Sequence, residues 1–316
     1  MRYIFGPVPS RRLGMSLGVD MVPYKTCSFD CVYCECGHTT VHEKTRRRYF
    51  DSIADVLDEI SSALKTGRQI DYITLGGSGE PTLNLELGET IREIKRLTDV
   101  KVAVLTNGSL ITDKGVFQEL LNADLVVPSL DSARQASFEK VNLPAKGILV
   151  AEIIEAQRDF VRAFDGDVWL EILIVEDLND SEDDLIALTE AVNRINPLLV
   201  QVGTVERPGS EEWAKPVSFE VLKMLASRIG PNAMVIGGPK RTFSEDTGRD
   251  IASDILALVS RRPCTIEDIE SAVGGKRPIL LGEIRELSAK DKIATYMHKG
   301  KIFYVGGRGQ KIRELE

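Results

Sequence analysis

The sequence has no uninterrupted run of eighteen apolar residues. A transmembrane helix needs about 20 of them, so we expect no membrane-spanning segment. The first twelve residues, MRYIFGPVPSRR, also lack the apolar stretch of a secretory signal peptide. Cysteine is scarce outside one short segment, because four of the five cysteines lie at positions 27, 31, 34 and 36. Loops this small cannot staple a large fold, so we expect a cytoplasmic protein whose cysteines bind metal.

An excess of positive charge is also missing. The chain has 40 Lys and Arg against 48 Asp and Glu, and its sequence pI is about 5.2. This balance argues against a generally basic nucleic-acid-coating protein, although it leaves room for a local basic patch. With 43% hydrophobic and 28% charged residues in 316, the composition fits a large folded domain with room for a second, smaller one.

Short apolar runs alternate with segments of helical period along most of the chain. The expected strands are residues 16–20, 71–75, 100–105, 125–129, 168–175 and 198–205. The expected helices are residues 53–64, 85–97, 112–121, 148–164 and 181–195. This α/β pattern predicts βαβ units around a parallel sheet. Six strands are too few for a closed eight-stranded barrel. We therefore predict an open partial (β/α)6 barrel over residues 1–240, with a flat doubly wound sheet as the alternative.

A different pattern follows a polar linker at residues 237–248. Thr265 and Asp268 have the spacing of a capping box at a helix start. Two further helical stripes and two strand-like runs, 293–297 and 301–305, complete the region. We predict that residues 241–316 form the linker and a small C-terminal winged helix-turn-helix domain. We expect this domain to be autonomous and to recruit a substrate or partner, with nucleic acid and protein both open.

The densest chemical signal is the cysteine loop at residues 25–37, KTCSFDCVYCECG. Cys27, Cys31 and Cys34 have the spacing C-x3-C-x2-C. A [4Fe–4S] cluster usually takes four thiolates, so three would leave one iron open, as a catalytic metal requires. The alternative is a structural zinc ion held by these three cysteines and Cys36, with His38 as a further candidate. The role of Cys36 stays open between bystander, substitute ligand and shield of the cluster.

The cysteine spacing, with Tyr33 directly before the last cysteine, resembles the signature of the radical S-adenosylmethionine (SAM) superfamily. The resemblance implies a [4Fe–4S] cluster on Cys27, Cys31 and Cys34, with SAM bound at the open iron. It also implies reductive cleavage of SAM to a 5′-deoxyadenosyl radical that abstracts hydrogen from a substrate. An electron donor such as flavodoxin or ferredoxin is expected. Residues 5–14 and 25–27 together are similar to a microbial subgroup of poorly defined activity.

Further motifs fall at the carboxyl ends of the expected strands, where barrel enzymes place their chemistry. The glycine-rich segment 76–82, GGSGEPT, resembles the superfamily motif that holds the SAM amino group. Small polar residues follow the next two strands. They resemble superfamily residues that lie near the SAM carboxylate and ribose, and the alternative is that they only form turns or helix caps. The resulting cofactor-binding candidates are Tyr33, Gly77, Gly79, Glu80, Thr106, Asn107, Ser129 and Asp131.

Several weaker candidates remain. Glu171 is expected either to face the cavity or to be a paired structural acid, residues 202–204 to line the adenine, and residues 206–209 to form a substrate loop. A basic run at residues 44–48, and Arg11 with Arg12, would suit a solvated face, an anionic substrate or an acidic electron donor. No histidine has identifiable partners, and no catalytic residue is assigned.

Two functions follow from these observations. The leading prediction is a radical SAM enzyme acting on an unidentified substrate, with macromolecules among the candidates, whose C-terminal domain takes no part in SAM cleavage. The alternative is an iron–sulfur sensor that binds DNA through the winged helix. A sensor, however, has no need of a glycine-rich acidic motif, and residues 251–316 carry only 12 Lys and Arg against 9 Asp and Glu.

Overall fold

The computed structural model describes residues 2–10, 12–236, 251–260, 262–298 and 300–307. Eight strands form one sheet in the order β1-β2-β5-β6-β7-β8-β9-β10. Only β1 and β2 are antiparallel, and every other neighbouring pair is parallel. The strands are β1 (Ile4–Ser10), β2 (Gly14–Asp20), β5 (Tyr72–Gly76), β6 (Lys101–Thr106), β7 (Leu125–Pro128), β8 (Asp167–Ile174), β9 (Leu199–Thr204) and β10 (Ala233–Val235).

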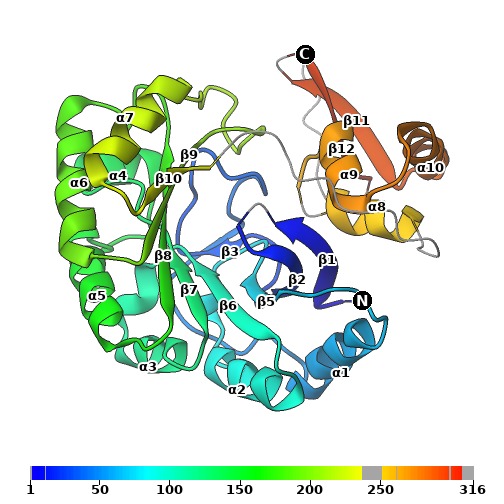
Figure 1. The fold of residues 1–316 in the computed structure, drawn as a ribbon, viewed down its shortest axis with the longest axis horizontal. Coiled ribbons are helices and arrows are strands. Elements are labelled where there is room, and N and C mark those ends of the chain that lie inside the picture. The colour runs from blue at the N-terminus through cyan, green and yellow to red at the C-terminus, as the bar shows by residue number, and fades with distance from the viewer. Residues whose placement is uncertain (1, 11, 237–250, 261, 299, 308–316) are drawn as a thin grey trace.

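Helices cover the convex side of this curved sheet (Figure 1). They are α1 (Ile53–Leu64), α2 (Leu87–Leu97), α3 (Lys114–Leu120), α4 (Gln135–Asn142), α5 (Val150–Ala163), α6 (Glu182–Ile195) and α7 (Phe219–Ile229). Two 3-10 turns, η1 (Pro81–Leu83) and η2 (Ser109–Thr112), follow β5 and β6. Because the helices lie on one face, the sheet is the predicted partial barrel rather than a flat sheet covered on both faces.

The six predicted strands correspond to β2 and β5 to β9, in the expected order. The sheet is two strands wider than predicted, because β1 adds to one edge and the short β10 adds to the other. The apolar runs are continuous because the central strands are buried on both faces. Leu17, Ile73 and Leu75, for example, are fully buried between the sheet and the helices. Burying each such side chain stabilises the fold by about 1.5–3 kcal/mol.

The cysteine loop follows β2 and carries two short strands, β3 (Thr26–Cys27) and β4 (Val41–His42), which pair with each other in parallel. It lies on the concave side of the sheet (Figure 1). Lys25 has a φ of +57°, in the left-handed region that non-glycine residues seldom adopt. Its backbone is held by the N–H of Lys25, which donates to the Ser78 carbonyl, and by its own carbonyl, which accepts from Thr40 and Val41. The loop is thereby tied to the turn after β5.

The C-terminal unit contains α8 (Ile251–Val259), α9 (Ile266–Val273), α10 (Arg277–Ala289) and a hairpin of β11 (Ile293–His298) and β12 (Lys301–Gly306). The Thr265–Asp268 capping box is present at the start of α9, as predicted. The elements follow the order expected for a winged helix-turn-helix, and that assignment stays a prediction. The predicted linker and the domain boundary at residue 240 fall outside the described residues.

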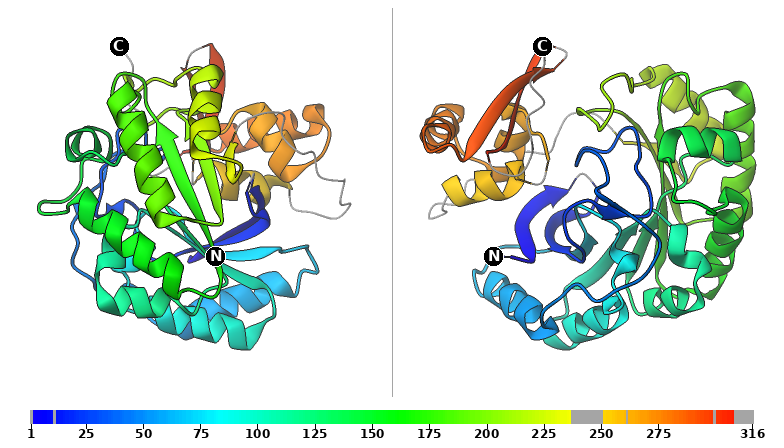
Figure 2. Two further views of the ribbon diagram at one scale, coloured as in Figure 1. Left: turned by 60° about the vertical axis from the view of Figure 1, so that its left-hand side comes forward. Right: turned by 180° about the vertical axis from the view of Figure 1, so that it is seen from behind.

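The C-terminal unit packs beside β1, as both further views show (Figure 2). Its apolar core includes Val8 of β1 at its margin. Arg68, before β5, forms an ion pair with Asp254 of α8 at 3.0 Å. The unit therefore packs against the barrel, and its autonomous folding stays a prediction.

Candidate functional site

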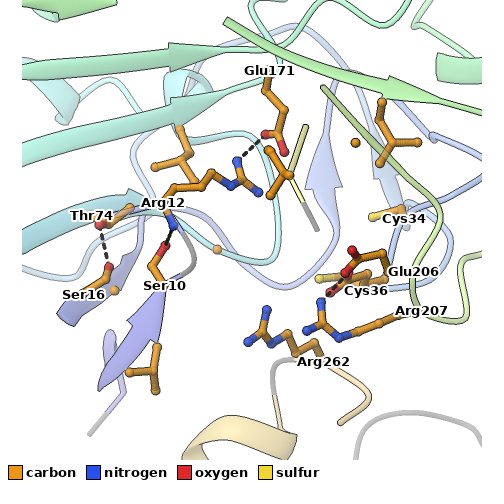
Figure 3. A pocket seen from close by; sticks show the side chains of 18 of the residues that line it. Ser10, Arg12, Ser16, Cys34, Cys36, Thr74, Glu171, Glu206, Arg207 and Arg262 are labelled. Carbon is orange, nitrogen blue, oxygen red and sulfur yellow. Dashed lines mark hydrogen bonds and ion pairs between the residues drawn. The ribbon is translucent and has the colours of Figure 1, made fainter. Parts of the chain in front are cut away.

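A cavity of about 430 Å³ lies inside the barrel, between the concave face of the sheet and the C-terminal unit (Figure 3). This volume is within the range of small-molecule pockets. Cys34 and Cys36 line it from the cysteine loop, and Gly77 lines it from the turn after β5. Ala257 and Leu258 of α8 line it from the C-terminal unit. The C-terminal unit is thus one wall of the cavity.

The cysteines of the C-x3-C-x2-C motif accept hydrogen bonds from amide side chains of other elements. The Asn107 amide, after β6, donates to Cys27 Sγ at 3.5 Å, and the Asn142 amide, at the end of α4, donates to Cys31 Sγ at 3.4 Å. The Phe29 backbone N–H also donates to Cys27 Sγ, at 3.5 Å. Donors of this kind orient metal-bound thiolates and stabilise their charge.

The third sulfur lies beside a buried cation. Lys25 is 2% exposed, and its Nζ donates to Cys34 Sγ at 3.1 Å. Burial opposes the charged form of Lys25, yet its pKa is raised because Cys34 and the other nearby cysteines attract the ammonium. A hydrogen bond from Cys36, together with Lys25, lowers the pKa of Cys34 to about 6. Cys34 is therefore the cysteine most readily present as a thiolate.

Burial has the opposite effect on the other two sulfurs. It raises the pKa of Cys27 to about 12 and also raises the pKa of Cys31. Thiols of this kind release their protons when a metal binds, since a coordinated thiol is deprotonated by the charge of the ion. Three sulfurs that each receive N–H donors, with a buried cation beside one of them, fit an anionic metal–thiolate group.

Within the described residues, no three Cys, His, Asp or Glu side chains converge on a single metal ion. A tetrahedral zinc site requires such convergence, whereas the cysteines of a [4Fe–4S] cluster each bind a different iron. The other zinc-ligand candidate, His38, instead faces Asp30 at 3.3 Å and Glu211 at 3.7 Å. The choice between the cluster and a zinc ion stays a prediction.

The glycine-rich turn packs directly on the cysteine loop. The Glu80 backbone N–H donates to the Thr26 carbonyl at 3.0 Å. A Cβ on Gly79 would lie 2.2 Å from the same carbonyl oxygen, so only glycine allows this approach. Gly77 has a φ of +118° and lines the cavity. The two motifs that the sequence analysis singled out are therefore adjacent.

The carboxylate of Glu80 is buried and fully engaged. Its Oε1 accepts from the Thr82 N–H at 3.0 Å and from the hydroxyls of Thr82 and Thr106 at 2.6 Å. Its Oε2 accepts from the Asn107 N–H at 2.7 Å. Unlike Gly77, Glu80 is not among the residues that line the cavity. Glu80 thus joins the turns after β5 and β6, and its predicted contact with the SAM ammonium stays a prediction.

Tyr33, which is half-buried, and Asp131, which is buried, form a pair between the cysteine loop and the end of β7. The Tyr33 hydroxyl, the Asn142 amide and the Leu173 N–H all donate to the Asp131 carboxylate. Burial raises the pKa of Asp131 to about 6, although these donors oppose the rise. Ser129 forms an isolated bridge with Glu171 of β8. Tyr33 lines the cavity, whereas Ser129 and Asp131 do not.

Most of the weaker candidates on β8, β9 and the loop after β9 line the cavity. Glu171 lines the cavity and forms an ion pair with Arg12 at 2.6 Å, so it is both a cavity residue and a paired acid. Gly203 and Thr204 of β9 line the cavity, while Val202 is buried in the core. Glu206 and Arg207, from the expected substrate loop, also line it.

The arginines of the basic run are neutralised within the chain. Arg46 pairs with Glu119, Arg47 with Glu43, and Arg48 with Glu86. These ion pairs favour the solvated structural face over an anion- or donor-binding patch. Arg11 lies outside the described residues.

Three neighbours of the cysteine loop were not predicted from the sequence. Lys25 and Asn142 contact cysteines of the C-x3-C-x2-C motif, and Arg207 joins the cysteine loop to the C-terminal unit. Lys25 is the first residue of the cysteine-loop segment 25–37, so its position close to Cys27 could have indicated a contact with the cysteines. The other two lie more than a hundred residues from their cysteine-loop partners in sequence, so no local pattern reveals them.

The remaining cysteine and the histidines lie apart from the cavity. Cys264 is buried in the core of the C-terminal unit, where burial raises its pKa to about 11, as suits an inert thiol. His42 contacts the Ser28 carbonyl, and His298 packs edge-on against Phe303. None of the helices in the described part of the chain is long and apolar enough to cross a membrane.

Comparisons with known proteins agree with this geometry. The family model of the radical SAM superfamily matches residues 21–189, which include the cysteine loop and strands β5 to β8. A UPF0026 protein of Methanocaldococcus jannaschii is 33% identical over 311 residues, covering 96% of each chain. A GTPase Obg of Brachyspira hyodysenteriae is 41% identical over 220 residues, which are 70% of this chain but only 32% of that protein.

Among solved structures, a radical SAM methyltransferase from Sphaerobacter thermophilus superposes with a TM-score of 0.52 at 18% identity. The match covers 70% of this chain and 65% of that one. At this identity the likeness concerns the fold alone. The cysteine loop, the partial barrel and the sequence matches lead to one assignment. The chain belongs to the radical SAM superfamily and to the UPF0026 family, and it is an enzyme of SAM-dependent radical chemistry.

Proposed function

We propose that this enzyme holds a [4Fe–4S] cluster on Cys27, Cys31 and Cys34 and uses it to cleave SAM reductively. The observation that carries the proposal is the set of three cysteine sulfurs on the concave side of the barrel, each accepting an N–H hydrogen bond. One of the three, Cys34, opens onto the cavity. A group with three protein ligands keeps one iron for a further ligand.

When bound, such a cluster supplies one electron, taken from a one-electron donor, that breaks a carbon–sulfur bond of SAM to give methionine and a 5′-deoxyadenosyl radical. The hydrogen atom that the substrate would lose would then be recovered in 5′-deoxyadenosine. We expect the donor to be a flavodoxin or a ferredoxin.

The chain's own residues position and shield this chemistry. Gly77 gives the backbone close access to a ligand in the cavity. Glu80 fixes Thr106 and Asn107 relative to Cys27, and the Tyr33–Asp131 pair fixes the cysteine loop against β7. Ala257 and Leu258 add an apolar wall that excludes water from the cavity.

The C-terminal unit is proposed to be a winged helix that presents the substrate, with protein and nucleic acid both open. The DNA-binding sensor draws no support from the comparisons, since none of the matches reported above is to a regulator. The cavity wall formed by α8 also links the unit to catalysis rather than to a separate readout of DNA.

The test of this proposal is anaerobic reconstitution with iron and sulfide, followed by metal analysis. The wild type should bind about four irons. Replacement of Cys27, Cys31 or Cys34 by Ala should abolish the cluster, whereas Cys36→Ala should leave most of it. Cys264→Ala is the matched control, because that thiol lies in the core of the C-terminal unit. Stoichiometric zinc without iron would contradict the proposal.

A further inference from the structure

Three arginines line the cavity, and two of them are neutralised by acidic partners. Arg12 pairs with Glu171 at 2.6 Å. Arg207 is 7% exposed and donates to Glu35 at 2.8 Å and to Asp268 at 3.3 Å. The positive charges of these two side chains are therefore compensated inside the protein.

The third arginine, Arg262, follows α8 in the C-terminal unit and is partly buried. It forms no ion pair with any residue that the structure describes, in contrast to Arg12 and Arg207. Figure 3 shows Arg262 and Arg207 on the same side of the cavity, near Cys36.

The acidic residues that line the cavity do not account for Arg262. Glu171 and Glu35 are held by the other two arginines, and Glu206 has an interaction of its own. Arg262 is therefore a guanidinium without an ion-pair partner in the described part of the chain, and it lines a cavity large enough for a ligand. A guanidinium binds carboxylates and phosphates through paired N–H donors.

We propose that Arg262 binds an anionic group, a carboxylate or a phosphate, of the substrate; this rests on the proposed function. SAM also carries a carboxylate. The predicted SAM-binding residues, however, all belong to the barrel, whereas Arg262 reaches the cavity from the C-terminal unit. The C-terminal unit thereby contributes to substrate recognition inside the cavity itself.

The test is calorimetric titration of the reconstituted full-length protein with inorganic phosphate and with malonate, each with and without SAM. Arg262→Gln should weaken both anions by at least about fivefold, since a hydrogen-bonded charge is lost. Arg262→Lys should restore part of the affinity. The matched control is Arg285→Gln, which removes an exposed arginine of α10 and should change nothing. The affinity for SAM should be the same in all four proteins.

Equal anion affinity in the wild type and Arg262→Gln, or no measurable binding by the wild type, overturns the assignment. A loss of SAM affinity in Arg262→Gln also overturns it, because the anion would then be the SAM carboxylate. Failure of the wild type to bind a cluster or cleave SAM would instead overturn the proposed function.

Discussion

The guanidinium of Arg207 lies 3.3 Å from the carboxylate of Asp268, and both side chains are 7% exposed. Arg207 follows β9, and Asp268 lies in the first turn of α9. Because Arg207 also pairs with Glu35, between Cys34 and Cys36, one buried cation joins the cysteine loop to the C-terminal unit. We therefore expect docking of that unit and order in the cysteine loop to be coupled.

This coupling predicts the effect of Asp268→Asn. The variant keeps an oxygen for the capping box but removes the charge that Arg207 faces. We expect the free energy of unfolding to fall by about 1.5–3 kcal/mol, the contribution of a hydrogen bond to a charged group. Glu267→Gln, on the same turn, removes an exposed ion pair and should cost less than about 1 kcal/mol. Equal losses in denaturant titrations of the two variants would contradict the coupling.

Lys25 should tune the cluster electrostatically. Its buried ammonium lies 3.1 Å from Cys34 Sγ, so it favours the more negative, reduced cluster. We predict that Lys25→Met lowers the reduction potential in a titration followed by electron paramagnetic resonance, and that Lys25→Arg keeps it closer to the wild type. Lys44→Met, at an exposed site, is the control. A potential unchanged in Lys25→Met would show that this cation does not act on the cluster.

Glu80→Gln tests whether Glu80 acts through structure or through SAM. An amide nitrogen would replace one of two oxygens that accept four hydrogen bonds. We expect a loss of about 1–3 kcal/mol in the free energy of unfolding of the cluster-free protein, before any SAM is added. Glu43→Gln, which removes an exposed ion pair, serves as the comparison. Unchanged stability with weakened SAM binding would instead support direct recognition of the SAM ammonium.

Asp131 should give the cluster-free protein a distinctive pH dependence. Burial raises its pKa from 3.8 to about 6 in the fold. Above pH 6 the carboxylate is charged in both the folded and the unfolded states, and the fold carries the cost of burying it. Between about pH 6 and pH 4 only the folded state takes up the proton, so stability rises as the pH falls, by at most about 3 kcal/mol.

Asp131→Asn lacks this titration, so the comparison isolates it. We expect the wild type to gain stability relative to Asp131→Asn as the pH falls from about 7.5 to about 4.5. Denaturant unfolding at the two pH values measures the difference. A difference that stays constant with pH would mean that Asp131 is ionised throughout.

The central strands were predictable because burial on both faces leaves continuous apolar runs, as at Val102 and Val104. β1 was not, because Pro7 and Pro9 interrupt its pattern, and proline is tolerated there only because the strand lies at an edge. Helix α4 was also missed, since its eight residues have only two buried apolar side chains. Local sequence reveals a strand or helix through its hydrophobic periodicity. A short element or an edge strand has too few buried apolar residues to show that periodicity clearly.

The candidate site shows the same division. The cysteine loop and the Gly77–Glu80 turn could be predicted to meet, because parallel strands bring their carboxyl ends together. Their chemistry could not be fully predicted. The Glu80 carboxylate accepts hydrogen bonds from Thr106 and Asn107, which lie one βα unit further along the chain. The contribution of Arg262 to the cavity arises from docking of the C-terminal unit, which no local pattern encodes.

The most direct test of the account is the formation of 5′-deoxyadenosine by the reconstituted enzyme, given SAM and a chemical one-electron reductant under anaerobic conditions. The account predicts 5′-deoxyadenosine and methionine in equal amounts from the wild type and from Cys36→Ala. It predicts none from the Ala variants of Cys27, Cys31 and Cys34. A wild-type protein that carries its cluster, is reduced, and forms no more 5′-deoxyadenosine than those variants would contradict it.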